Sequence, residues 1–373
     1  MVNARYTSTS AGGVRVLLPT TNTNREPKTR SRRNSSVSNS QRRTTTSNPS
    51  GTSQNRGGCS LDRDNNLNLH HAQRESRLLL MGNTNTTGSN VLNANEKIIT
   101  SSNCVRKLTN RAAFYRHYNS CTTIGRGNFS RVYLLQNSNT TPTKSAVKEI
   151  DKDRVHIDYV YNEISILNSC KHDNICVLID AFESPNYFFL LFEFAPFGDL
   201  FEFIKQTGIP TESNSACITF QIASALEYLH GKRIVHRDIK PENVLIMSER
   251  RIKLTDFGLA CTVLGPLYRV CGTPTYVAAE VINEQGYGIE IDIWSLGVIL
   301  HILLVGYGPF RAPTRSQLFK LIRRANLQFD TPRWAHISTE AQTTVRKMLV
   351  PNPRRRITAA ALLEDDWIQS HVN

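Results

Sequence analysis

The sequence has no apolar run long enough to cross a membrane and no closely spaced pair of cysteines. Its longest apolar stretch, residues 293–305, is interrupted by Ser295, Gly297 and His301 and is shorter than the ~20 residues that a membrane helix needs. The eight cysteines form no Cys-x-x-Cys motif, which argues against a zinc site or a disulfide framework. We therefore expect a cytoplasmic chain with reduced thiols, no transmembrane segment and a buried core helix at residues 293–305.

Acidic residues are nearly absent from the N-terminal part of the chain, where the first is Glu26. Residues 1–110 hold 16 Lys and Arg against 5 Asp and Glu, so most of the formal net charge of +14 lies there. The segment is rich in Ser, Thr and Asn, with too little apolar surface to offset the entropy lost on folding. We predict a disordered basic tail over residues 1–112. It has no apolar core typical of a secretory signal, although its composition also resembles that of a transit peptide.

From Tyr118 onward the apolar pattern predicts a strand-rich region followed by a helix-rich region. The predicted strands are residues 120–124, 131–136, 145–150 and 187–194. The predicted helices are residues 157–170, 217–229, 293–305, 315–324, 339–349 and 359–368. We therefore predict an α+β protein of two lobes, with a small antiparallel sheet and one main helix at residues 118–193. A larger helical lobe is expected at residues 198–370.

A glycine pair follows the first predicted strand, in the stretch Gly-Arg-Gly-Asn-Phe-Ser-Arg-Val. Glycines allow backbone N–H groups to approach phosphate oxygens closely, because no Cβ intervenes. By itself the pair also fits an ordinary hairpin turn, so its meaning depends on the motifs that follow. The candidate nucleotide-binding residues of this stretch are Ile124, Gly125, Arg126, Gly127, Asn128, Phe129, Ser130, Arg131 and Val132.

A lysine and a glutamate with a suggestive spacing come next. Lys148 ends the triplet Ala-Val-Lys on a predicted strand, and Glu163 lies 15 residues later on a predicted helix. Either residue alone would be an ordinary solvated charge. The order of glycine loop, lysine and helical glutamate, together with the motifs that follow, instead resembles a phosphate-contacting strand lysine paired with an acid on the next helix, which implies that Glu163 holds Lys148.

The most informative residues are 236–243, His-Arg-Asp-Ile-Lys-Pro-Glu-Asn, and 256–258, Asp-Phe-Gly. They resemble the catalytic loop and the metal-binding turn of protein kinases. The resemblance implies that Asp238 accepts the proton of a substrate hydroxyl, with Lys240 and Arg237 as further catalytic residues. It also implies that Asn243 and Asp256 bind Mg²⁺. A lysine two residues after the aspartate is the form typical of Ser/Thr kinases, so we expect an ATP-dependent Ser/Thr protein kinase that acts on protein substrates.

The resemblance covers residues 118–370. Within the protein kinases this region is most similar to the calcium/calmodulin-dependent group, in particular to the doublecortin-like kinases. The long run from Asp256 to Val277 carries much of it. The resemblance implies an adenine pocket and a hinge beside it. The residues implied are Val132, Ala146, Leu245, the back-pocket residue Phe192, the backbone of Glu193 and Ala195, and Asp199. Residues 1–110 do not resemble doublecortin domains. Because the sequence ends at Asn373, soon after Trp367, we expect no direct control by calmodulin.

The chain departs from the family pattern at three informative positions. Ser130 replaces the third glycine of the loop, and Ala279 replaces a proline before Glu280. We expect Glu280 still to pair with Arg356. Arg269 stands where relatives often have a phosphorylatable threonine, so we hypothesise an active form that needs no phosphate at this position.

Two acids, Asp199 and Glu242, match positions that contact basic substrate residues in Arg-directed kinases. They predict a preference for Arg three residues before the acceptor Ser or Thr. Alternatively, both serve only ribose contact and local structure. Four tail sites have this spacing, at Ser35, Ser36, Thr45 and Thr46, so the tail is a candidate self-substrate. Two rival functions stay open. One is a catalytically impaired scaffold. The other is an adaptor whose basic tail binds microtubules or anionic surfaces and so associates with the cytoskeleton.

Overall fold

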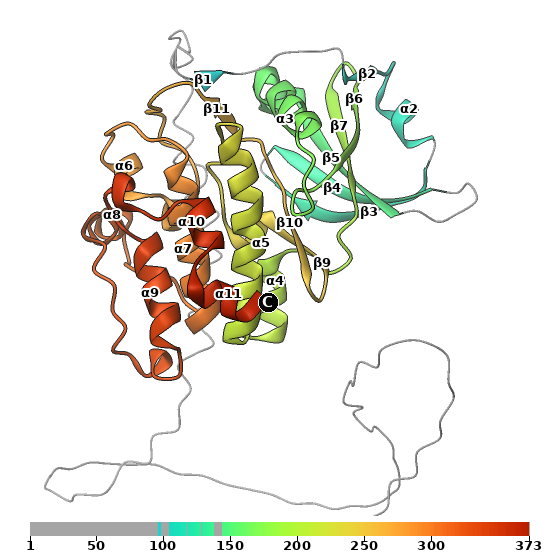
Figure 1. The fold of residues 1–373 in the computed structure, drawn as a ribbon. Helices are drawn as coiled ribbons and strands as arrows, with labels where there is room; N and C mark the ends of the chain where they lie inside the picture. The colour runs from blue at the N-terminus through green and yellow to red at the C-terminus, as the bar shows by residue number, and fades with distance from the viewer. Residues whose placement is uncertain (1–95, 98–103, 117, 128, 138–143, 373) are drawn as a thin grey trace, which may run out of the picture. The chain divides into compact units, whose positions relative to one another are not determined.

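The computed structural model describes residues 96–97, 104–116, 118–127, 129–137 and 144–372 (Figure 1). The chain divides into two units, residues 1–59 and 60–373, and all described residues belong to the second. Most of the predicted basic tail therefore lies outside the described residues. The described part has the two lobes that the sequence predicted, one built on a sheet and the other mainly helical.

The smaller lobe is built on a six-stranded sheet in the order β2-β6-β7-β5-β4-β3, antiparallel except for β2 beside β6. Its strands are β2 (Arg106–Lys107), β3 (Tyr118–Arg126), β4 (Ser130–Asn137), β5 (Lys144–Asp151), β6 (Leu178–Glu183) and β7 (Tyr187–Glu193). Alternate residues of β7 face opposite sides of the sheet, and all of them from Phe188 to Phe192 are buried. Phe188, Leu190 and Phe192 join the main core, whereas Phe189 and Leu191 join a separate aromatic cluster.

Helix α3 (Ile157–Ser169) is the main helix of this lobe and lies beside the sheet in Figure 1. Its buried residues Val160, Ile164 and Leu167 have the spacing of one helical face, as the sequence predicted. The same helix buries Glu163, which cannot be explained by apolar packing. The helix therefore has a polar residue held inside the protein, and this residue belongs to the candidate site.

The structure corrects the predicted end of the tail at residue 112. Residues 104–116 instead form a strap on the sheet, with strand β2 and helix α2 (Arg111–Tyr115). Phe114 is 2% exposed and stacks on Phe189 with ring centroids 4.5 Å apart. Arg111 forms two hydrogen bonds with buried Glu149, at 2.8 and 3.1 Å. The strap's elements are too short to show periodicity, so their order is explained by their partners on the sheet, Phe189 of β7 and Glu149 of β5.

The larger lobe contains the remaining elements. They are α4 (Leu200–Thr207), α5 (Glu212–Gly231), β8 (Ile234–Val235), β9 (Val244–Ser248), β10 (Arg251–Leu254), β11 (Cys261–Val263), α6 (Ala279–Ile282), α7 (Glu290–Val305), α8 (Arg315–Arg324), α9 (Thr339–Met348), α10 (Ala359–Leu363) and α11 (Asp366–Val372). Strands β9 and β10 form a hairpin, and β11 lies between β8 and β1 (Glu96–Lys97). Helices α3, α8 and α9 fall within the predicted ranges, whereas α5 and α7 begin earlier than predicted, and α4 and α6 were not predicted. The predicted helix at 359–368 is wrong, because Asp365 accepts hydrogen bonds from Thr344 and Lys347 and separates two short helices.

Helix α7 is the core helix of the larger lobe, as predicted. Fourteen of its 16 residues are buried, so its apolar character serves packing inside the protein. A Cβ on Gly297 would lie 2.8 Å from the Cβ of Met348, so glycine is required where α9 approaches α7. Among the described helices, none combines the length and apolar character needed to cross a bilayer.

Candidate active site

The predicted glycine loop is a hairpin between β3 and β4. Gly125 pairs with Val132, and the N–H of Gly127 donates to the carbonyl of Ser130 at 2.8 Å. Ser130 itself lies in β4 opposite Ile150, in extended backbone that any residue can adopt. The loss of the third glycine therefore leaves the hairpin intact. Asn128 lies outside the described residues.

Several residues of the predicted nucleotide pocket lie on one face of the sheet in the smaller lobe. Val132 pairs directly with Lys148, and Ala146 pairs with Phe192, so these four side chains share a face. Two of the other predicted pocket residues approach from elsewhere. Leu245 of β9 forms an isolated bridge with Asp199 in the other lobe, and Ile124 on β3 is 49% exposed.

Lys148 joins both lobes through its ammonium group. Its Nζ lies 2.7 Å from Oε1 of Glu163 on α3 and 2.9 Å from Oδ1 of Asp256, which follows β10. Burial alone would lower the pKa of Lys148, but the charges of Asp256 and Glu163 outweigh it and raise the pKa. The predicted Lys148–Glu163 pair is therefore present, and Asp256 is a second partner that the sequence did not predict.

Asp238 lies in a compact set of polar side chains on the catalytic-loop motif. Lys240 donates to Oδ2 of Asp238, and Asn243 Nδ2 donates to the backbone carbonyl of Asp238 at 2.8 Å. Thr273 Oγ1 donates to Oδ1 of Asp238 at 3.0 Å and accepts from Lys240 at 3.2 Å. No role was predicted for Thr273, although it follows Gly272 in the downstream segment that resembles kinases. The set holds the Asp238 carboxylate between cationic and hydroxyl donors.

The backbone of this loop is held by Asp292 of α7. Its carboxylate accepts from the backbone N–H of His236 at 2.9 Å and of Arg237 at 3.0 Å. These bonds hold Arg237 at φ 68°, a left-handed conformation that is costly for a residue with a Cβ. A Cβ on Gly272 (φ 96°) would lie 2.7 Å from the Arg237 carbonyl oxygen, so the downstream segment approaches the loop closely there.

The pair predicted to close the downstream segment is also present. Arg356 donates to both carboxylate oxygens of Glu280, at 2.7 and 2.9 Å, and both side chains are buried. Arg356 also donates to the backbone carbonyl of Val350. Replacement of the usual proline by Ala279 therefore does not remove this bidentate pair.

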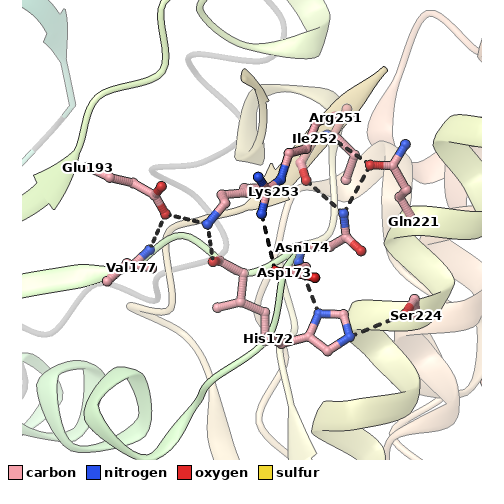
Figure 2. Close-up of polar contacts among 11 residues, drawn as sticks. His172, Asp173, Asn174, Val177, Glu193, Gln221, Ser224, Arg251, Ile252 and Lys253 are labelled. Carbon is pink, nitrogen blue, oxygen red and sulfur yellow. Dashed lines mark hydrogen bonds and ion pairs between the residues drawn. The ribbon is translucent and has the colours of Figure 1, made fainter. Parts of the chain in front are cut away.

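The hinge between the lobes is held from behind by a polar network (Figure 2). The side chain of Glu193 accepts from Lys253 Nζ at 2.6 Å and from the backbone N–H of Val177 at 2.7 Å. Asn174 donates to Gln221 and to the carbonyl of Ile252. The carboxylate of Glu193 therefore binds Lys253 of β10 and the N–H of Val177. The predicted nucleotide contacts of Glu193 involve its backbone instead. Ala195 follows two residues later and is half-buried.

Two carboxylates lie near Asp238 without a cationic partner among the contacts described. Asp199 caps α4 by accepting from the backbone N–H of Glu202 at 2.9 Å. Oε2 of Glu242 is buried and has no hydrogen-bond partner among the described residues. Burial raises the pKa of Glu242, and the negative charges of Asp238 and Asp199 add to this effect while Lys240 opposes it. Burial likewise raises the pKa of Asp199.

A family model described as "Protein kinase domain" matches residues 118–368, well over half of the chain. The chain belongs to the protein kinase family. The match begins at β3 and ends in α11, so it contains Lys148, Asp238 and Asp256 and excludes the strap.

Curated relatives agree with this family. Serine/threonine-protein kinase DCLK3 of Homo sapiens is 41% identical over 263 residues, which is 68% of this chain and 40% of that protein. DCLK1 of Rattus norvegicus is 42% identical over 266 residues, 69% of this chain and 61% of that protein. DCLK2 of Rattus norvegicus is 42% identical over 260 residues, 67% of this chain and 34% of that protein. The resemblance to doublecortin-like kinases is confirmed, while the chain spans less than two thirds of each of these relatives.

Proposed function

We propose that this chain is a Ser/Thr protein kinase that transfers the γ-phosphate of ATP to hydroxyl groups of protein substrates. The observation that carries the proposal is the position of Lys148, which bridges Glu163 and Asp256 across the two lobes. This bridge requires α3 and the Asp-Phe-Gly turn to lie where a phosphate-binding lysine needs them. The catalytically impaired scaffold is disfavoured, because Ser130 lies in regular strand and Glu280 keeps its arginine.

In this proposal ATP binds between the hinge and the sheet face that carries Val132, Ala146 and Lys148. Val132, Ala146 and Leu245 contact the adenine, and backbone groups of Glu193 and Ala195 form hydrogen bonds with its edge. Backbone N–H groups of the β3–β4 hairpin and the ammonium of Lys148 hold the phosphates. Ile124 covers the nucleotide from the hairpin side, where its half-exposed side chain is free to pack.

The donor set near the phosphates fits Mg²⁺. Magnesium prefers oxygen ligands, and Asp256 supplies a carboxylate whose side chain is 29% exposed. Asn243 commits its amide nitrogen to Asp238, which leaves the side-chain oxygen as its ligating atom. When bound, the metal neutralises phosphate charge.

Asp238 accepts the proton of the substrate hydroxyl as that oxygen forms a bond to the γ-phosphorus. The bond from phosphorus to the β,γ-bridging oxygen breaks, and ADP leaves with the electron pair. Lys240 hydrogen-bonds Asp238 and neutralises charge on the transferred group. Thr273 fixes the other carboxylate oxygen, so it orients the proton acceptor.

The proposed substrate preference rests on two carboxylates, Glu242 and Asp199, that form no ion pair with another described residue. An arginine guanidinium pairs well with a carboxylate, and Glu242 has a buried oxygen without a hydrogen-bond partner in the described part of the chain. Asp199 adds negative charge nearby, as its effect on the pKa of Glu242 indicates. We therefore propose a preference for Arg three residues before the acceptor Ser or Thr.

An arrayed Ser/Thr peptide library tests both parts of the proposal. Wild-type chain incubated with ATP should label peptides with Arg at the third position before the acceptor, and Asp238→Asn should lose the signal. Glu242→Gln should keep activity on peptides without Arg and lose the preference. Labelling that ignores Arg would reject the specificity, and no labelling despite ATP binding would return the account to the scaffold.

The basic tail supports a second role that does not exclude the first. Its excess of Lys and Arg favours binding to acidic surfaces such as microtubules or anionic membranes, and phosphorylation of its Arg-x-x-Ser/Thr sites would remove about 1.5 to 2 charges each. These residues lie outside the described part of the chain. Salt-sensitive cosedimentation before and after incubation with ATP tests this role. Binding that is equal in both preparations would argue against charge control.

A further inference from the structure

Arg269 and Tyr159 make a contact between the segment that follows the Asp-Phe-Gly turn and helix α3. Arg269 Nη1 donates a hydrogen bond to the Tyr159 hydroxyl, and the guanidinium carbon lies 4.9 Å from the centroid of the Tyr159 ring. Both side chains are half-buried, which strengthens a cation–ring attraction relative to full exposure. Two separate interactions thus join the same pair of residues.

The backbone of Arg269 is anchored in the larger lobe. The hydroxyl of Tyr287 donates to the carbonyl of Arg269 at 2.5 Å. Two residues earlier, Leu267 and Tyr287 exchange backbone hydrogen bonds of 2.8 and 2.9 Å. Arg269 therefore has a fixed backbone in one lobe, and its side chain reaches the helix of the other.

Tyr159 lies one helical turn before Glu163 on α3, so the two side chains are on the same face of the helix. Glu163 in turn holds Lys148 at 2.7 Å. Further along α3, Asn162 donates to the carbonyl of Ala260, close after the Asp-Phe-Gly turn. Arg269 adds a second attachment at the N-terminal end of the helix, where the chain enters from His156.

We propose that Arg269 is a positioning residue that holds α3, and with it Glu163, in the arrangement that pairs with Lys148. The guanidinium of Arg269 attaches α3 to the segment that follows the Asp-Phe-Gly turn by direct contact, so this attachment needs no phosphate at position 269. Arg237 is consistent with this, because it is buried and its Nε donates to the carbonyl of Leu259. The expected effect of Arg269 on the rate rests on the proposed kinase activity, whereas its expected effect on α3 rests on the contacts described above.

The test compares phosphatase-treated full-length variants by amide hydrogen exchange in α3 and by the KM for ATP and kcat on an Arg-containing peptide. Arg269→Ala and Tyr159→Ala should each speed exchange in α3 and lower kcat/KM for ATP by about 5- to 30-fold. The double variant should be no worse than either single variant, because both remove one interaction. Arg269→Lys should recover part of the loss, since a cation still faces the ring. Leu264→Ala, at a residue 56% exposed on the same segment, is the matched control and should change nothing.

Unchanged exchange in α3 for Arg269→Ala would overturn the inference, as would additive losses in the double variant or complete loss of wild-type activity on phosphatase treatment. A wild-type chain that transfers no phosphate would reject the proposed function, but the exchange comparison would still decide the contact with α3. Thermal unfolding of each variant separates these results from a general loss of fold, and Tyr159→Phe keeps the ring if Tyr159→Ala does not fold.

Discussion

Lys253 donates a hydrogen bond of 2.6 Å to Glu193, and this ion pair ties the end of β7 to β10 in the other lobe (Figure 2). The Lys253 side chain is 6% exposed and that of Glu193 is 26% exposed. The proposed adenine contacts come from the backbone of Glu193, whereas the ion pair uses its side chain. This relationship leads to the first prediction.

Lys253→Met should destabilise the protein by about 2 kcal/mol, less than the 3–5 typical of a fully buried pair because Glu193 keeps some solvent contact. It should also raise the KM for ATP more than it lowers kcat, since the hinge binds ground state and transition state alike. Urea unfolding and steady-state kinetics measure both effects. Arg251→Ala is the matched control, because the Arg251–Asp173 pair is exposed and should contribute less than about 0.5 kcal/mol. Equal effects of the two changes would contradict the hinge role.

Phe114→Ala should destabilise the protein by about 3 kcal/mol, because a buried aromatic ring is lost from a small cluster that cannot easily collapse. The ring stacks on Phe189 and lies outside the segment that matches the kinase family. Chemical denaturation measures the change. Thr109→Ala, at an exposed position in the same strap, should stay within about 0.5 kcal/mol of wild type. A neutral Phe114→Ala would mean that the strap is dispensable.

Ala279→Pro should raise the stability by about 0.4–1 kcal/mol, because proline reduces the freedom of the unfolded chain. Ala279 is the first residue of α6, where a proline loses no helical hydrogen bond. The preceding Ala278 has φ −73° and ψ 156°, which a following proline accepts. The thermal midpoint should rise by a few degrees. A fall would show that neighbouring side chains leave no room for the ring, since Ala279 is 2% exposed.

The preference for Arg-containing peptides should weaken as the pH falls. Burial raises the pKa of Glu242 above its ordinary 4.5, so this carboxylate becomes neutral at a higher pH than an exposed glutamate. Only the ionised form pairs with a guanidinium. The ratio of kcat/KM for peptides with and without Arg should therefore fall as the pH is lowered, and the fall should begin at a higher pH than the protonation of an exposed glutamate would give. Glu242→Gln should show a low ratio at every pH, and a pH-dependent ratio in that variant would assign the effect to another group.

The order of motifs along the sequence predicted two long-range contacts correctly. The pairs Lys148–Glu163 and Glu280–Arg356 both join residues whose types and order are informative. Chemical coupling made these predictable, because an acid, a base and a phosphate-binding loop have few reasons to occur in that order by chance. The long helices were predictable because their apolar faces repeat over several turns.

Other contacts left no readable signal in the sequence. Lys253 stands in a four-residue strand, where a lysine normally faces solvent, and only the fold brings Glu193 to it. Phe114 belongs to a helix of five residues, Arg111–Tyr115, which is too short for a periodic pattern, so the predicted tail ended at residue 112, inside this helix. Arg269 was noticed only as a missing phosphorylation position, and its partner Tyr159 is 110 residues away. Such pairs depend on three-dimensional packing of elements distant in the chain.

The central claim is that this chain transfers phosphate and that Asp238 is required for it. The most direct measurement is transfer of label from γ-labelled ATP to a Ser peptide with Arg at the third position before the acceptor. Wild type and Asp238→Asn should bind ATP equally, and the variant should transfer label at least about a hundredfold more slowly. Absence of transfer by wild type despite ATP binding, or equal transfer by the variant, would contradict the account.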